Sequence, residues 1–152
     1  MKTFVLTVSR RFPVTHKRKV ELTFFADKLY FGQKIHTIRA NYNLWFKRIE
    51  QVQKGEAILS IRYWSGKPYN SKQFEIRQLD KDSGIGVQRI EFYEDKDGVP
   101  SIKYPLINNH AEPDIKVIAD NDGLSFEDFK EWFKGYDLSE PMAILHFTKF
   151  RY

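Results

Sequence analysis

The 152-residue sequence contains no cysteine. Disulfide bonds, thiolate zinc sites, iron–sulfur clusters and cysteine nucleophiles are therefore excluded. The four histidines are scattered too widely along the chain to form a metal-binding motif: His16, His36, His110 and His146. We therefore expect neither a metal ion nor any other cofactor.

Long apolar runs and glycine-rich phosphate loops are also missing. No stretch approaches the roughly 18 apolar residues that cross a bilayer, and residues 1–10 have no apolar run long enough for a signal peptide. Gly84 and Gly86 form only a G-x-G pair, without the third glycine or the following helix of a phosphate loop. A nucleophile elbow and an H-E-x-x-H motif are absent too. We expect a cytoplasmic protein without a membrane partner, outside the standard hydrolase and zinc-enzyme classes.

The residues that are present predict one folded domain, residues 1–152. Hydrophobic residues make up 41% of the chain and aromatic residues 16%, which is enough for a core, and 30% of the residues are charged. The net charge of +5 is unevenly spread. Residues 1–50 hold 11 Lys and Arg against 3 Asp and Glu, whereas residues 101–152 hold 6 against 9. A one-sided positive field of this kind favours a polyanionic partner such as nucleic acid, although a solvated basic face would look the same.

Hydrophobic periodicity predicts an α+β fold. Alternating runs indicate strands at 4–8, 56–64, 72–79, 85–94, 101–104 and 142–150, with a brief extended segment within 34–39. Helical spacing indicates helices at 23–31, 41–54, 113–123 and 125–135. Thr23 and Ser125 are the expected N-caps of two of these helices, and Gly55 is expected just after the end of another. The four strands between residues 56 and 104 follow one another and are expected to form an antiparallel meander or barrel.

Two basic segments are candidates for nucleic-acid contact. The connection after the first strand is crowded with cations and is either a phosphate-contacting loop or an exposed loop tip. Trp64 and Lys67 lie at a turn rich in aromatic and basic residues, where unstacked bases would find partners. Trp64 is equally compatible with the core. The basic residues of the first segment are Arg10, Arg11, Lys17, Arg18 and Lys19.

The segment GQKIHTIR, residues 32–39, places a lysine, a threonine and an arginine within six positions. Lys34, Thr37 and Arg39 could bind or process an anion; alternatively, Lys34 and Arg39 are surface charges flanking a strand in which Thr37 is present for its β-propensity. Strict strand alternation would put Lys34 and Thr37 on opposite faces. For both to meet one ligand, Lys34 must lie in the turn after Gly32, before the strand begins.

The order of these motifs resembles the ASCH domain family of the PUA-like superfamily. The resemblance includes the G-x-K-x-x-T-x-R run, the helix ending at Gly55, the strand ending at Trp64, the Asp122-Gly123 pair before an aromatic helix, and the last strand. It covers about residues 20–150, with residues 1–20 and 85–112 as elaborations. The resemblance implies a partly open β-barrel with three or four flanking helices and a cleft for RNA or a nucleoside.

Some small bacterial members of this family are similar to amidohydrolases that deacetylate N(4)-acetylcytidine. The resemblance implies that Lys34 acts as general base, Thr37 as nucleophile and Asp122 as proton donor. Asp122 is one methylene shorter than the glutamate of the family pattern. A threonine nucleophile needs a neighbouring base, and a lysine can serve only if burial or a nearby cation lowers its pKa. Arg39 could provide that cation, or it could bind the substrate.

We therefore expect a domain that binds RNA or a modified nucleoside in a cleft built from the GQKIHTIR segment and Asp122. An amidohydrolase and a non-catalytic adaptor domain are the alternatives. The residues expected to contact nucleic acid are Arg10, Arg11, Lys17, Arg18, Lys19, Lys34, Arg39, Trp64 and Lys67.

Overall fold

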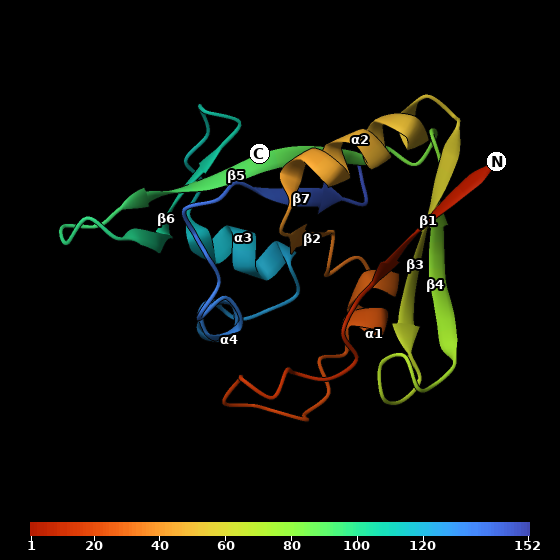
Figure 1. Ribbon diagram of the computed structural model, residues 1–152, viewed down its shortest axis with the longest axis horizontal. Helices are drawn as coiled ribbons and strands as arrows, with labels where there is room; N and C mark the ends of the chain where they lie inside the picture. Colours follow the sequence, from red (N-terminus) through yellow and green to blue (C-terminus); the bar gives the residue numbers. More distant parts are fainter.

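Seven strands and four helices make up the fold of residues 1–152, all of which the computed structural model describes (Figure 1). The helices are α1 (Phe25–Tyr30), α2 (Tyr42–Gln53), α3 (Ile115–Asn121) and α4 (Phe126–Trp132). The three-stranded sheet has the order β1-β3-β4 and contains β1 (Lys2–Thr7), β3 (Ala57–Trp64) and β4 (Gln73–Leu79). The four-stranded sheet has the order β2-β7-β5-β6 and contains β2 (His36–Arg39), β7 (Met142–His146), β5 (Gly86–Glu94) and β6 (Pro100–Ile107). The expected α+β class is confirmed.

The expected meander of four consecutive strands is wrong, because the chain changes sheet between β4 and β5. β3 and β4 pair antiparallel, but the other edge of β3 is taken by β1, which runs parallel to it. β5 pairs with β6 on one side and with the distant β7 on the other. Both extra partners come from the ends of the sequence, so local turn patterns could not identify them.

The α2 helix connects the two sheets, as Figure 1 shows. Trp45, Ile49 and Val52 are buried on one face of it, as the helical spacing predicts, and α2 packs against β3, β5 and β7. The side chain of Asn41 accepts the Leu44 N–H and caps the helix. The buried apolar side chains of both sheets and the helices form one contiguous cluster. None of the four helices has the length and apolar character that crossing a membrane requires.

The two predicted N-caps have different outcomes. Ser125 caps α4 as expected, since its side chain accepts the Asp128 N–H at 3.1 Å. Thr23 lies one residue before the cap position of α1, although its hydroxyl accepts the Phe25 N–H at 3.3 Å. The cap position belongs to Phe24, whose backbone is left-handed, while the Thr23 hydroxyl donates to the carbonyl oxygen of Ser9 at 2.7 Å. The Thr23 hydroxyl therefore joins the start of α1 to the chain after β1.

Candidate functional site

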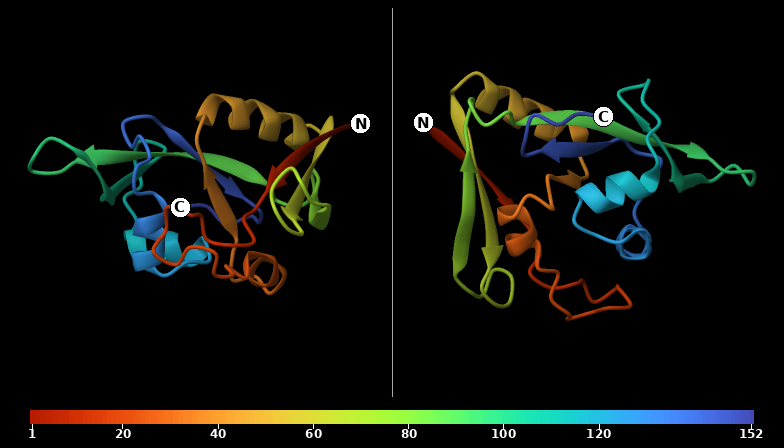
Figure 2. Two further views of the ribbon diagram at one scale, coloured as in Figure 1. Left: turned by 60° about the horizontal axis from the view of Figure 1, so that its bottom comes forward. Right: turned by 180° about the vertical axis from the view of Figure 1, so that it is seen from behind.

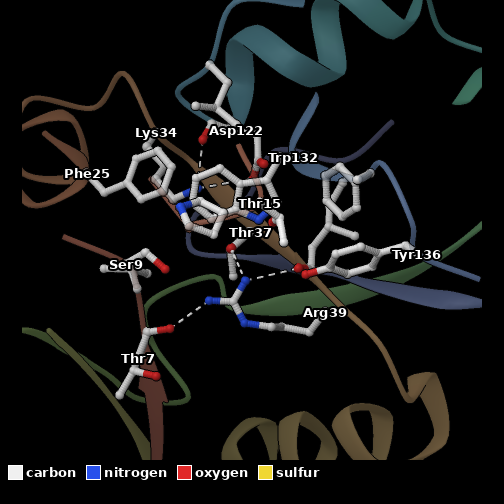
Figure 3. A pocket seen from close by; sticks show the side chains of 15 residues that line it. Thr7, Ser9, Thr15, Phe25, Lys34, Thr37, Arg39, Asp122, Trp132 and Tyr136 are labelled. Atoms are coloured by element: carbon white, nitrogen blue, oxygen red, sulfur yellow. Dashed lines mark hydrogen bonds and ion pairs between the residues drawn. The ribbon is translucent and has the colours of Figure 1, made fainter. Parts of the chain in front are cut away.

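A pocket of about 340 Å³ lies where the end of β1, the start of α1, strand β2 and the α3–α4 junction meet (Figure 3). Its lining includes Lys34, Thr37, Arg39 and Asp122, so residues 88 positions apart come together in one cavity. β2 begins at His36, which leaves Lys34 in the preceding turn. The sequence required this placement for Lys34 and Thr37 to face one ligand, and the structure has it.

Lys34 and Asp122 form a buried ion pair in the wall of this pocket. Their residues are only 2% and 5% exposed. The Lys34 ammonium donates to the Asp122 main-chain carbonyl at 2.7 Å and to its Oδ1 at 3.2 Å, and it lies 4.3 Å from the centre of the Phe25 ring. The approach is close because residue 123 is glycine: a Cβ there would lie 3.2 Å from the Lys34 Cβ.

Burial and pairing shift the pKa values of this ion pair. Burial lowers the pKa of Lys34, against the opposing attraction of Asp122, and the charges of Arg39 and Lys28 lower it further. Burial alone would raise the pKa of Asp122, but the charge of Lys34 and the hydrogen bond with His36 bring it below its usual value. Asp122 is therefore ionised at neutral pH, and Lys34 loses its proton more readily than an exposed lysine.

Thr37 and Arg39 share one face of β2, because they are two residues apart. The Arg39 guanidinium donates to the Thr37 Oγ1 at 2.7 Å and to the Thr7 carbonyl oxygen at 2.6 Å, as Figure 3 shows. Burial lowers the pKa of Arg39, but a guanidinium starts from so high a value that it stays charged. The Thr37 hydroxyl is therefore in contact with a cation, and its hydrogen-bond partner is Arg39 rather than Lys34.

A second layer of polar residues lies behind Asp122 and was not predicted from the sequence. His36 Nδ1 is 3.3 Å from Asp122 Oδ1, and its Nε2 is 2.6 Å from the Tyr152 hydroxyl. Asn121 donates to that same hydroxyl at 3.0 Å. Burial lowers the pKa of His36 and raises that of Tyr152, so both are neutral. The bonding pattern then assigns the His36 proton to Nδ1, from which it donates to Asp122.

Aromatic side chains form the remaining walls of the pocket. Phe25, Trp132 and Tyr136 surround the polar residues in Figure 3. Phe129 on α4 is completely buried. Trp132, on the same helix, is only half-buried and lines the pocket. Aromatic faces next to charged groups suit a flat, polar ligand.

A second pocket, of about 740 Å³, contains four of the other residues predicted to bind nucleic acid. Arg10, Arg11, Trp64 and Lys67 all line it. The remaining three predicted residues line neither pocket. Lys17 and Lys19 are exposed, and Arg18 donates to Asp128 on α4 at 2.6 Å.

Comparison with protein-family models, with curated proteins and with solved structures gives no match for this chain. The resemblance to the ASCH family therefore stays a prediction from sequence motifs. No three His, Asp or Glu side chains are grouped as a metal ion would need.

Proposed function

We propose that the protein binds RNA or a modified nucleoside, with one base held in the pocket of Lys34, Thr37, Arg39 and Asp122. The observation that carries the proposal is the convergence of two cations, a hydroxyl and a carboxylate between aromatic walls. A volume of about 340 Å³ falls in the range of small-ligand pockets. The α+β fold, with two sheets bridged by α2, is compatible with the PUA-like partly open barrel of ASCH domains, which we include in the proposal.

The chemistry of the pocket matches the edges and faces of a nucleobase. A carboxylate such as Asp122 accepts hydrogen bonds from an exocyclic amine, and Lys or Arg donates to ring carbonyl oxygens. Trp132 is half-buried and offers an aromatic ring on which a base can stack. The positive charge of residues 1–50 attracts the phosphates of a longer ligand.

Calorimetric titration with N(4)-acetylcytidine and with cytidine tests this proposal. Thr37→Val removes the hydroxyl at nearly constant volume and leaves Arg39 without one partner, so we expect about a tenfold loss of affinity. Thr3→Val is the matched control, because Thr3 is exposed on β1 and lies outside the pocket. Equal affinities in Thr37→Val and the wild type would contradict the proposal.

The second candidate function is hydrolysis of an N-acylated cytidine. It is favoured by the contact of Thr37 with a cation and by the lowered pKa of Lys34 in the same pocket. In this mechanism Lys34 reacts in its neutral form: it takes the proton of the Thr37 hydroxyl as that hydroxyl attacks the acyl carbonyl, the C–N bond breaks, and water later hydrolyses the ester. The lowered pKa of Asp122 keeps it ionised, so protonated Lys34 would supply the proton to the leaving amine. Asp122 then acts as the acceptor that holds Lys34.

Incubation with N(4)-acetylcytidine and chromatography of the products tests the enzymatic function. If the protein is an amidohydrolase, the wild type releases cytidine, Thr37→Ser keeps part of the activity, and Thr37→Val loses it. No cytidine, where a known amidohydrolase is active, rejects hydrolysis but leaves binding in place. Failure to bind either the nucleoside or single-stranded RNA at low salt would favour the adaptor alternative instead.

A further inference from the structure

The two pockets adjoin each other along the segment that follows β1. Thr7, Val8, Ser9 and Pro13 line both of them. The Arg39 guanidinium in the first pocket is bonded to the Thr7 carbonyl oxygen, which fixes this shared wall. The two pockets therefore lie on either side of one short segment of the chain.

The second pocket has an aromatic pair, a half-buried Trp64 and an exposed Tyr69. The rings of Trp64 and Tyr69 have their centroids 5.2 Å apart, and Tyr69 is 88% exposed. Tyr69 also has a left-handed backbone, with φ of 64°, which is unfavourable for a residue with a bulky side chain. Neither burial nor a hydrogen bond of its side chain compensates for this conformation within the chain. The exposed Tyr69 ring beside Trp64 is therefore available to a stacking ligand.

The turn that carries Tyr69 is held in a fixed position. The Ser71 hydroxyl accepts the Gly66 N–H at 3.0 Å and donates to the Lys67 carbonyl oxygen at 2.8 Å. Arg10 donates to the Ser65 carbonyl oxygen at 2.6 Å and joins the turn to the segment after β1. The aromatic pair is therefore preorganised beside the shared wall.

The charge of the second pocket is of one sign. Arg10, Arg11 and Lys67 line it and are exposed, and its lining contains no Asp or Glu. Cations next to exposed aromatic rings are the combination that single-stranded nucleic acids use, since phosphates meet the cations and bases stack on the rings. An acidic peptide or a polyphosphate would use the cations but not the rings.

We infer that the second pocket is a subsite for the nucleotide next to the one held in the first pocket. The ligand is then single-stranded nucleic acid of at least two nucleotides, rather than a free nucleoside. One base occupies the first pocket, the backbone passes over the wall of residues 7–13, and the next base stacks on Tyr69. This inference rests on the proposed function, because it needs the first pocket to hold a base.

Fluorescence anisotropy with a fluorescein-labelled RNA hexanucleotide of randomised sequence tests the subsite, beside calorimetry with N(4)-acetylcytidine. Tyr69→Ala should weaken hexanucleotide binding about tenfold, the loss of one base–aromatic stack, and leave nucleoside binding unchanged. Lys67→Gln should lower the slope of log K against log salt by about 0.7, the value for one phosphate contact to a single strand. Tyr30→Ala is the control, because Tyr30 is 72% exposed on α1 and lies outside both pockets.

The outcomes separate this inference from the proposed function. Suppose that nucleoside binding depends on Thr37, but the hexanucleotide binds no more tightly than the nucleoside or is insensitive to Tyr69→Ala. This result would overturn the subsite and leave the first pocket as a nucleoside site. Hexanucleotide binding that depends on Tyr69 but is unaffected by Thr37→Val would overturn the proposed function. It would also overturn the inference that the two pockets bind neighbouring nucleotides. Displacement of the hexanucleotide by polyglutamate at equal concentration would overturn the assignment to nucleic acid.

Discussion

At the scale of single residues, the site depends on a buried charge pair. Lys34 and Asp122 are almost without solvent contact, and each is the nearest opposite charge of the other. Breaking such a pair by removing one partner leaves an uncompensated charge in the interior. The same two residues therefore support both the fold and the proposed ligand contacts.

We predict that Asp122→Asn lowers the free energy of unfolding by about 3 kcal/mol, because Lys34 stays buried without its counter-charge. The double variant Lys34→Met with Asp122→Leu should recover most of this loss, since it leaves no buried charge, and should still not bind nucleoside. Urea unfolding measures both effects. An Asp122→Asn protein as stable as the wild type would contradict the pairing.

The sequence predicted part of this site and missed another part. Lys34, Thr37 and Asp122 were expected to meet because their motifs resemble a family pattern, and the structure brings all three into one pocket. His36 carries no such signal. Its role depends on Asp122, 86 positions away, and on Tyr152, 116 positions away, and no local pattern encodes contacts over such distances.

At the scale of elements, the turn between α3 and α4 positions Asp122 against Lys34. Gly123 has φ of 82°, and both of its chain neighbours line the pocket. A side chain at residue 123 would be strained by the backbone and would also press on Lys34. Gly123 therefore allows Asp122 and Lys34 to approach each other in the site.

We predict that Gly123→Ala destabilises the fold by about 1–2 kcal/mol and weakens nucleoside binding, because Ala is strained at positive φ and displaces Lys34. Gly98→Ala is the matched control: Gly98 has φ of 74°, but a Cβ there would meet no atom within 4 Å. Thermal unfolding and calorimetry measure the two variants. Equal effects on binding in both would contradict the positioning role of Gly123.

The loop of residues 10–22 is attached to α4 through Asp128. His16 Nε2 lies 3.1 Å from the Asp128 carbonyl oxygen, and Arg18 donates to the carboxylate at 2.6 Å. Figure 2 shows this loop beside α4. The sequence left two interpretations of the basic cluster, a phosphate-contacting loop or an exposed loop tip. In the structure its residues have different environments. Arg10 and Arg11 line the second pocket, whereas Arg18 is paired within the protein.

We predict that Asp128→Ala increases the rate of tryptic cleavage after Lys17 and Lys19, because the loop loses its ion pair and opens more often. Glu127→Ala is the control, since Glu127 is exposed on the same helix and pairs only with Lys130. Mass spectrometry of the fragments gives the cleavage sites. Equal cleavage rates in the two variants would contradict the attachment of the loop through Asp128.

At the scale of the whole molecule, local patterns predicted the helices and strands but not their assembly into two sheets. α2 followed from its apolar spacing and from Gly55 at its end, and β5 from its alternation. The pairing of β5 with β7 and the parallel pairing of β1 with β3 join residues more than 50 positions apart. Such strand pairings depend on how the two sheets pack against α2 and the core. A local sequence pattern contains no information about this packing.

Two buried histidines make the stability of the whole fold depend on pH. Burial lowers the pKa of His146 to about 3 and also lowers the pKa of His36, so the folded state keeps both neutral while the unfolded chain protonates them below pH 6.5. The unfolded state then binds more protons, and stability falls as the pH decreases from about 6.5.

We predict a loss of at least about 2 kcal/mol between pH 7.5 and pH 4.5, from the His146 shift alone. His146→Gln should flatten this dependence, since glutamine does not titrate. Urea unfolding at the two pH values measures it. The same pH dependence in His146→Gln as in the wild type would contradict the assignment.

The central claim is that a base binds in the pocket of Lys34, Thr37, Arg39 and Asp122. Titration of ¹⁵N-labelled protein with N(4)-acetylcytidine, followed by backbone amide chemical shifts, tests it most directly. We predict that the largest shift changes fall on residues 34–39 and 121–124 and that Thr37→Val weakens them. Shift changes that are absent at millimolar nucleoside, or that cluster away from these two segments, would contradict the claim.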